Sequence, residues 1–496
     1  MNIDSILQIN RAYKFHNDLH RIIVTNNNSL LLRDLDESKY QSAFAWIMHP
    51  LVAYGLSLFN GQRTVSDVYR LLNIENQCSI EKFCELINRI TDNTDSVYMS
   101  LSFGKVEIPR FFLNQYDGKG YRDVLKGINI NQIMQTLDID SKRLYIPTNY
   151  MIMNTTACYT NCVYCYADRS HAPGRPFPFQ RILELLEESS TLGINAIDID
   201  GGDFFMYPQW YELLLAMHKY EYDPYVSTKM PLTESIVEKL VAADVKQVQL
   251  SLDSVRSEEL GKMLQVNDSY YGKIKKGMDL LESRGIDMTI KPVITKYNDS
   301  IKGIEELLYF TSKYEHVTSI NITPAGQSKF KKSVFFSSTA QLEKIAQKED
   351  EWNDRFGKKI EVLEYNARPT FEEKTKTFED RSICTGNRSS FFVLPDGKVT
   401  LCEQMYWHPF FILGDLFQNS IMEVWNSKKA LELASFSKSD VRECSPCKKC
   451  DIFDQCRHNI GVCWRDAIAA YGDENYDYPS PECPYAPQVT NDFYND

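Results

Sequence analysis

Three closely spaced cysteines are the part of this sequence best suited to chemistry. Cys158, Cys162 and Cys165 follow a C-x3-C-x2-C pattern directly after the apolar run 150–153, so we expect them in a loop at the end of a strand. A [4Fe–4S] cluster has four irons, and three thiolate ligands leave one iron open to a ligand from outside the protein. Structural zinc is the alternative, but it prefers four ligands, and the nearest further candidate, His171, lies in a Pro/Gly-rich loop.

The spacing of this cysteine loop (residues 158–165) resembles the signature of the radical S-adenosylmethionine (SAM) superfamily, in which an aromatic residue, here Tyr164, precedes the last cysteine. The resemblance implies that the amino and carboxylate groups of SAM chelate the open iron. It also implies that one electron splits SAM into methionine and a 5′-deoxyadenosyl radical, which abstracts hydrogen from an unactivated carbon. The protein then has to position both partners and exclude water.

The elements that must position this loop alternate regularly from residue 149 onward. Strand-like runs followed by helical patterns imply parallel strands with crossover helices. The expected strands span residues 149–153, 196–200, 225–228, 247–252, 287–294 and 319–323. Six such units match the partial (β/α)6, TIM-like barrel of the radical SAM family, so the predicted fold class is α/β. Catalytic groups then belong at the carboxyl ends of the strands.

Polar residues at the ends of these strands are candidate SAM contacts. Gly201-Gly202-Asp203 resembles the Gly-Gly-Glu motif that binds the SAM amino group, with Asp in place of Glu. Glycines let backbone approach a ligand closely, although an isolated pair is more often only a turn. The candidates after later strands are Ser227, Lys229, Ser251, Asp253 and Ala325, of which Ser251 is the preferred ribose contact. Asp253 has an alternative role as the cap of the following helix.

Eight cysteines between residues 384 and 483 resemble the SPASM extension of radical SAM enzymes, which carries two auxiliary [4Fe–4S] clusters. The resemblance assigns the outer cluster to Cys447, Cys450, Cys456 and Cys483. It assigns the inner cluster to Cys384, Cys402 and Cys463. Six residues separate Cys456 from Cys463, where the family pattern has three.

The inner set lacks a fourth cysteine, which leaves either an open iron that a substrate thiolate can bind or the recruitment of Cys444. A separate zinc ribbon is the alternative; it explains Cys447 and Cys450 but leaves Cys384, Cys402 and Cys483 without a role. Glu403 occupies the place where sulfatase-maturing relatives carry an acidic general base. A solvent-facing glutamate is the alternative explanation for that residue.

Residues 1–105 are expected to form a small winged-helix-like α+β domain. Apolar runs 21–24 and 29–33 indicate a hairpin, helical patterns cover 49–59 and 79–90, and Thr64 is a suitable N-cap for a helix between them. This arrangement resembles the recognition domain of enzymes that modify ribosomally made peptides, in which a leader segment pairs with a sheet edge. A packing domain without a ligand is the alternative. Cys78 and Cys84 are expected to be small core residues.

Composition narrows the function further. A net charge of −12 argues against binding to nucleic acid, and there is no apolar run of about 18 residues for a membrane span. Thirteen cysteines, an odd number, in a chain whose start lacks secretory-signal features predict reduced, metal-binding thiols in the cytoplasm.

The expected organisation is a recognition domain (1–105), a connector (106–145), a radical SAM barrel (146–335), a helical bridge (336–380) and a SPASM domain (381–496). The predicted function is oxidative modification of a precursor peptide through a thioether or carbon–carbon crosslink. It requires SAM, three [4Fe–4S] clusters and an external electron donor of the flavodoxin or ferredoxin type. The alternatives are a sulfatase-maturing enzyme that makes formylglycine and a cluster-containing peptide-binding protein without catalysis.

Overall fold

The computed structural model describes residues 2–26, 45–101, 104–118, 120–167, 174–326, 334–363, 378, 381 and 384–490. It divides into two compact units, Met1–Thr148 with Leu192–Asn195, and Asn149–Thr191 with Ala196–Asp496. The expected strand at 29–33 and the alternative ligand His171 lie outside the described residues.

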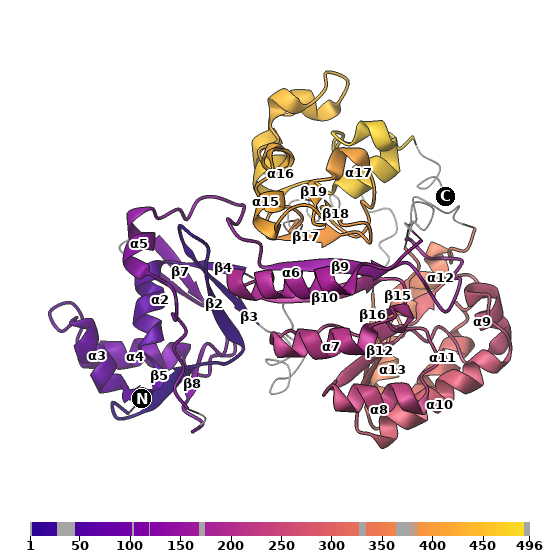
Figure 1. Ribbon diagram of the computed structural model, residues 1–496, viewed down its shortest axis with the longest axis horizontal. Coiled ribbons are helices and arrows are strands. Elements are labelled where there is room, and N and C mark those ends of the chain that lie inside the picture. The colour runs from indigo at the N-terminus through magenta and orange to yellow at the C-terminus, as the bar shows by residue number, and fades with distance from the viewer. Residues whose placement is uncertain are drawn as a thin grey trace. The chain divides into compact units, whose positions relative to one another are not determined.

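The first unit combines short antiparallel sheets with small helices (Figure 1). One sheet has the order β2 (Tyr13–Asn17), β3 (Ile22–Asn26), β4 (Ala45–Met48). A second has the order β5 (Asn60–Thr64), β1 (Ile6–Ile9), β8 (Leu113–Gln115), and a hairpin joins β6 (Val97–Leu101) to β7 (Gly104–Ile108). The helices are α2 (Pro50–Ser57), α3 (Val65–Leu72), α4 (Ile80–Ile90) and α5 (Ile130–Gln135).

Local sequence signals explain where the helices of this unit begin. Thr64 accepts a hydrogen bond from the Asp67 backbone, and the Asp67 carboxylate accepts one from the Thr64 backbone, which forms a capping box. The predicted cap is therefore confirmed. On α4 the apolar positions turn inward and bury Phe83, Cys84, Ile87 and Ile90. Cys84 is a core residue as predicted, whereas Cys78 precedes the helix and packs, partly exposed, against the same core.

The first unit extends beyond the expected boundary at residue 105. Strand β8 pairs with β1, and Phe112 and Leu113 are fully buried. Ile133 of α5 is 2% exposed in the same core. The stretch 106–145 is thus part of this unit rather than a free connector, because its few apolar side chains complete the core.

The second unit contains the barrel strands, all parallel to their barrel neighbours. They are β9 (Asn149–Thr155), β10 (Ala196–Gly201), β11 (Ser227–Thr228), β12 (Gln247–Leu250), β13 (Asp287–Ile290), β14 (Val293–Ile294) and β15 (Val317–Pro324). The intervening helices are α6 (Phe179–Leu192), α7 (Trp210–Lys219), α8 (Glu234–Ala242), α9 (Ser257–Leu264), α10 (Ser269–Ser283) and α11 (Ile301–Thr311). The predicted partial barrel is confirmed, with β13 and β14 dividing its fifth strand.

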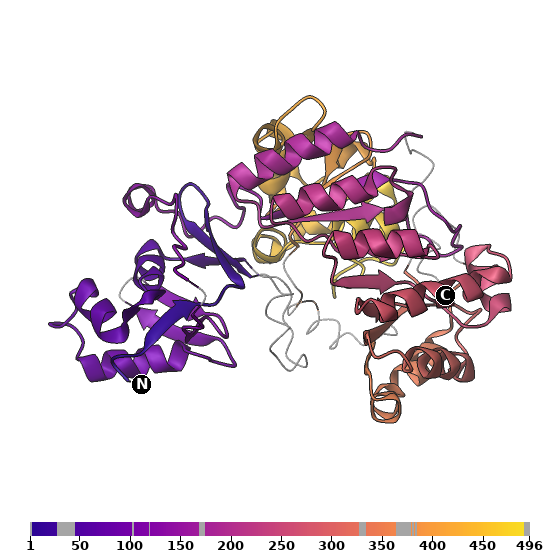
Figure 2. The ribbon, with the colours of Figure 1, turned by 60° about the horizontal axis from the view of Figure 1, so that its bottom comes forward.

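Two additional strands extend the barrel sheets at opposite ends. The region expected to be a helical bridge contains α12 (Thr339–Ala346) and α13 (Glu349–Phe356), but also β16 (Lys359–Val362), which pairs in parallel with β15. On the other side β17 (Ser390–Val393), from the cysteine-rich region, pairs in parallel with β9. In Figure 2 this gold C-terminal region accordingly lies beside the magenta strands β9 and β10.

The C-terminal region is a small sheet with short helices around it. Strands β18 (Lys398–Thr400) and β19 (Gly414–Asp415) continue the sheet from β17. The helices are α15 (Ile421–Trp425), α16 (Lys428–Ala434) and α17 (Trp464–Tyr471), with short helical turns at Pro446–Lys449 and Asp454–Ile460. Within the described part of the chain no helix has the length and apolar character to cross a membrane.

Candidate active site

The cysteine loop begins where β9 ends and is held by bonds to the end of α9. The backbone N–H of Asn161 donates to the carbonyl of Leu264 at 3.0 Å, and that of Val163 donates to the carbonyl of Met263 at 2.9 Å. The Asn161 side chain also donates to Gln265 Oε1 at 2.6 Å. These contacts fix the path of a loop that has no regular secondary structure.

The three thiols of this loop are chemically suited to an iron–sulfur cluster. Cys158, Cys162 and Cys165 form no disulfide and are partly exposed, and Thr160 Oγ1 lies 3.2 Å from Cys162 Sγ. Within the described residues no three His, Cys, Asp or Glu side chains converge on one point as the ligands of a single metal ion do. A [4Fe–4S] cube attaches each cysteine to a different iron, so it does not need such convergence.

Two glycines bring the end of β10 against the cysteine loop. A Cβ on Gly201 would lie 2.4 Å from Met153 Cγ and 2.7 Å from the carbonyl oxygen of Thr155, and Gly201 has a φ of 115°. A Cβ on Gly202 would lie 2.1 Å from the carbonyl oxygen of Ala157. The Gly202 N–H donates to Thr155 O at 2.8 Å. Only glycine permits this approach, because any side chain would displace the loop.

Asp203, the third residue of the motif, is already bonded to protein groups. Its carboxylate accepts hydrogen bonds from Thr228 Oγ1 at 2.8 Å and from the backbone N–H groups of Phe205, Lys229 and Met230 at 3.2, 3.0 and 3.1 Å. Burial raises the pKa of Asp203, and these hydrogen bonds partly offset that effect. The side chain therefore joins the end of β10 to β11, two strands that lie in different sheets.

Tyr164, from the cysteine loop, forms a largely buried group with Lys229 and Asp253. The Tyr164 hydroxyl donates to Asp253 Oδ2, and Lys229 Nζ lies 3.0 Å from the same oxygen. Lys229 also donates to the carbonyl of Ser251 at 2.8 Å, and Asp253 Oδ1 accepts from the Val293 N–H at 2.9 Å. Asp253 is 2% exposed. Its alternative role as a helix cap is wrong, because α9 follows Arg256 without a side-chain cap.

The other candidate SAM contacts lie at the same ends of the strands. Ser227 is opposite Gln249 in the β11–β12 pair, and Gln249 donates to Ser251 Oγ at 2.7 Å. Ala325 is 5% exposed, and its N–H donates to the carbonyl of Ile294 at 2.9 Å. The structure thus brings these positions to one end of the barrel, and their roles in SAM binding stay predictions.

Two acidic residues inside the barrel were missed by the sequence analysis. Asp198 and Asp200 lie opposite Met151 and Met153 in the β9–β10 pair, so they share the face on which Met153 packs. Burial raises the pKa of both carboxyls, and the charge of Glu403 raises that of Asp200 further. The alternation Ile197-Asp198-Ile199-Asp200 was the available signal, because alternate strand residues face the same side.

The predicted outer and inner ligands among the C-terminal cysteines differ in burial and exposure. Burial raises the pKa of Cys483 to about 11, and its thiol lies within electrostatic reach of the other three predicted outer ligands, Cys447, Cys450 and Cys456. Of the predicted inner ligands, Cys402 and Cys463 are mostly buried, which raises each pKa to about 12, whereas Cys384 is exposed. Cys444 is exposed, and its carbonyl accepts from Tyr478.

Comparison with known families identifies both regions. The radical SAM superfamily matches residues 152–308, and the SPASM iron–sulfur cluster-binding domain matches residues 384–451. The chain therefore contains a radical SAM domain followed by a SPASM domain. The two matches contain the cysteine loop and most of the C-terminal cysteines, so iron–sulfur clusters and SAM are its cofactors.

Peptide-modifying enzymes are among the relatives of this radical SAM–SPASM protein. PqqA peptide cyclase of Granulibacter bethesdensis is 22% identical over 349 residues, which are 69% of this chain and 88% of the relative. Mycofactocin maturase MftC of Mycolicibacterium smegmatis is 22% identical over 338 residues, or 66% of this chain and 80% of the relative. A probable GTP 3′,8-cyclase of Archaeoglobus fulgidus is 25% identical, but over only 34% of this chain and 56% of the relative.

The fold is shared with a solved structure along nearly the whole chain. SuiB of Streptococcus suis, bound to S-adenosylmethionine, superposes with a TM-score of 0.64 and 15% identity, and covers 96% of this chain and 99% of that chain. SuiB bound to its precursor peptide SuiA gives the same TM-score. The partial barrel and the C-terminal domain are therefore arranged as a known fold.

Proposed function

We propose that this protein cleaves SAM reductively at the cysteine loop and oxidatively modifies a ribosomally made precursor peptide. One observation supports the proposal above all: the cysteine loop is held at the carboxyl ends of the barrel strands. The contacts that hold it come from the Gly201-Gly202 turn, from Asp203 and from the Tyr164–Asp253–Lys229 group. In that position Cys158, Cys162 and Cys165 would hold a [4Fe–4S] cluster, which would supply the electron for SAM cleavage. The matches to peptide-modifying enzymes span two thirds of the chain, whereas the match to a nucleotide cyclase spans one third.

The protein's own residues hold and orient the cofactors in this proposal. Cys447, Cys450, Cys456 and Cys483 hold an outer auxiliary cluster, and Cys384, Cys402 and Cys463 hold an inner one. Three clusters and an external donor of the flavodoxin or ferredoxin type complete the set. The thiols suit this role because none of the thirteen cysteines forms a disulfide, so each can lose its proton and bind a metal as a thiolate. Such thiols persist in a reducing compartment, which favours the cytoplasm.

The first unit is proposed to bind the leader of the precursor. Its β2–β3–β4 sheet ends at β4, which pairs only with β3 among the described strands. An unpaired strand edge offers a row of N–H and C=O groups to an extended peptide. Ile47 of β4 is 42% exposed and supplies an apolar side chain beside that edge.

The test is anaerobic reconstitution followed by addition of SAM, dithionite and the peptide encoded next to the gene. The proposal expects 5′-deoxyadenosine together with a peptide that has lost a pair of hydrogen atoms. Formation of formylglycine in a sulfatase-derived peptide, with no change in the precursor, would favour the maturase alternative. Absence of 5′-deoxyadenosine with and without peptide would leave only a binding protein.

A further inference from the structure

Arg457 is a buried cation whose hydrogen-bonding groups are not all satisfied. It follows Cys456 and is 7% exposed. Its Nη2 donates to the carbonyl of Tyr478, but neither Nε nor Nη1 has a hydrogen-bond partner within the described part of the chain. A buried guanidinium with unsatisfied N–H groups is costly, so a native site that keeps one usually supplies an anion.

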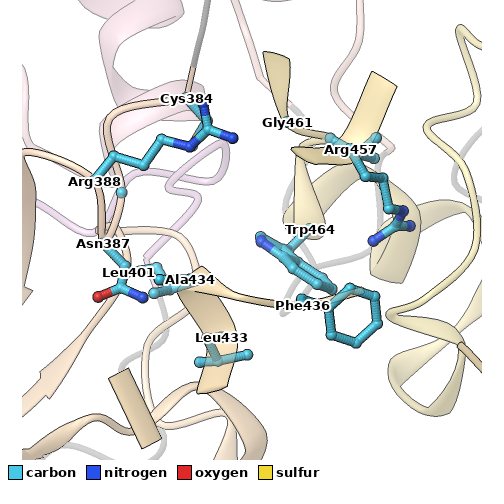
Figure 3. A pocket seen from close by; sticks show the side chains of 12 residues that line it. Cys384, Asn387, Arg388, Leu401, Leu433, Ala434, Phe436, Arg457, Gly461 and Trp464 are labelled. Atoms are coloured by element: carbon cyan, nitrogen blue, oxygen red, sulfur yellow. The ribbon is translucent and has the colours of Figure 1, made fainter. Parts of the chain in front are cut away.

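The guanidinium group of Arg457 lies close to two aromatic rings. The guanidinium carbon lies 5.0 Å from the centre of the Trp464 ring and 5.7 Å from that of Phe436. Figure 3 shows these three residues on one side of a pocket, opposite Cys384 and Arg388. Rings can hold the flat guanidinium in place, but they do not neutralise its charge.

Cysteine sulfurs are the groups that this guanidinium reaches. Arg457 directly follows Cys456 in the chain, and its positive charge lowers the pKa of the Cys447 and Cys456 thiols against the opposing effect of burial. A second arginine behaves similarly, since Arg381 Nη2 lies 3.1 Å from Cys456 Sγ. Arg381 differs in that its nitrogens also donate to backbone carbonyls, including that of Gly461 at 3.2 Å. Of these two arginines, Arg457 is therefore the one whose Nε and Nη1 groups have no hydrogen-bond acceptor among the described residues.

We propose that Arg457 is a positioning residue for the outer auxiliary cluster: its free N–H groups donate to cluster sulfur, and its charge compensates the anionic, thiolate-bound cluster. This inference rests on the proposed function, because it assumes that Cys447, Cys450, Cys456 and Cys483 bind a cluster. Hydrogen bonds to sulfur and nearby positive charge both raise the reduction potential of such clusters. Arg457 then sets how readily the outer cluster accepts an electron.

The experiment is a redox titration, followed by electron paramagnetic resonance, of the full chain with Cys158, Cys162 and Cys165 replaced by Ala, so that only auxiliary clusters remain. In this background Arg457→Gln should make one of the two auxiliary reduction steps about tenfold less favourable, about 59 mV for one electron. The other step should not move. Arg457→Lys keeps the charge but not the planar group, and should shift the same step by less.

Arg442→Gln is the matched control, because Arg442 bonds the buried Asp477 carboxylate instead of a thiol. It should change thermal stability without moving the reduction step that Arg457→Gln moves, because the cysteine that its charge reaches is Cys444, which is not a proposed outer ligand. Unchanged potentials in both Arg457 variants with full iron content, or an equal shift in Arg442→Gln, would overturn the proposal. If Arg457→Gln does not fold, the proposal is tested by whether Arg457→Lys shifts the same reduction step relative to the parent protein. The measurement needs neither SAM cleavage nor peptide, and a parent protein without auxiliary iron would instead refute the proposed cofactor set.

Discussion

The hydroxyl of Tyr164 donates a hydrogen bond to the carboxylate of Asp253, and so ties the cysteine loop to the end of the fourth barrel strand. Lys229 completes the pair from the end of the third strand, 3.0 Å from the same carboxylate oxygen. Three segments far apart in sequence thus meet in one buried group. The cysteine loop is therefore held through the hydrogen bond of Tyr164 to Asp253, and the Gly201-Gly202 turn packs against the residues that precede its first cysteine.

Replacement of Lys229 should reveal the cost of leaving Asp253 without its cation. The Asp253 side chain is fully buried, and removal of one partner from a buried pair costs about 3–5 kcal/mol. Lys229→Met should therefore lower the unfolding temperature of the apo-protein and slow SAM cleavage. Lys246→Met is the control, since Lys246 and its partner Asp244 are about 60% exposed and such pairs contribute at most about 1 kcal/mol. Equal effects of the two substitutions would contradict this role.

Replacement of Gly202 should displace the cysteine loop. A Cβ there lies 2.1 Å from the carbonyl oxygen of Ala157, so either the loop or the strand end must move. A shift of about 1 Å at a reacting centre can cost about 100-fold in rate, so Gly202→Ala should slow 5′-deoxyadenosine formation by about that factor. Gly272→Ala, in α10 with nothing within 4 Å of the added Cβ, should leave the rate unchanged and add stability. A Gly202→Ala protein with normal SAM cleavage would refute the steric argument.

The barrel was predictable because its signals are local and repeated. The bounds of α6 and the strand β9 follow from apolar periodicity, and Thr64 was recognisable as a cap from its own neighbours. The bonds of Asp203 to Thr228 were not predictable, since they depend on which strand ends meet. Strand β16 was missed because its four residues alternate within a charged segment, and its pairing with β15 is a long-range contact. No sequence pattern distinguishes buried Arg457 from an exposed arginine.

Removal of one cysteine from the loop should separate the active-site cluster from the auxiliary clusters. Cys162→Ala should abolish SAM cleavage while iron falls from about twelve to about eight atoms per chain, because the C-terminal cysteines still bind their clusters. Cys78→Ala, in the first unit, should change neither value. Retained cleavage in Cys162→Ala would end the assignment of the loop, and a parent content near four irons would end that of the auxiliary clusters.

Glu403 provides a test of acid–base chemistry between the barrel and the C-terminal domain. Its charge raises the pKa of Asp200 inside the barrel, and its role as a general base toward a substrate in that space stays a prediction. A positioned general base contributes about 100-fold or more, so Glu403→Gln should lower kcat for peptide modification by that factor. Cleavage of SAM without peptide should continue at the parent rate. Normal peptide turnover in Glu403→Gln would exclude Glu403 as the general base.

Leader binding should depend on the free edge of β4. Ile47→Asp places a charge on a half-exposed apolar position of that strand, and we expect affinity for the leader peptide to fall about tenfold, or about 1.4 kcal/mol. Leu215→Asp is the matched control, because Leu215 is 43% exposed on α7 in the other unit. Fluorescence anisotropy with a labelled leader distinguishes the two. Because the substitution leaves the barrel intact, Ile47→Asp should retain SAM cleavage, and unchanged leader affinity would mean that the first unit recognises its peptide elsewhere or not at all.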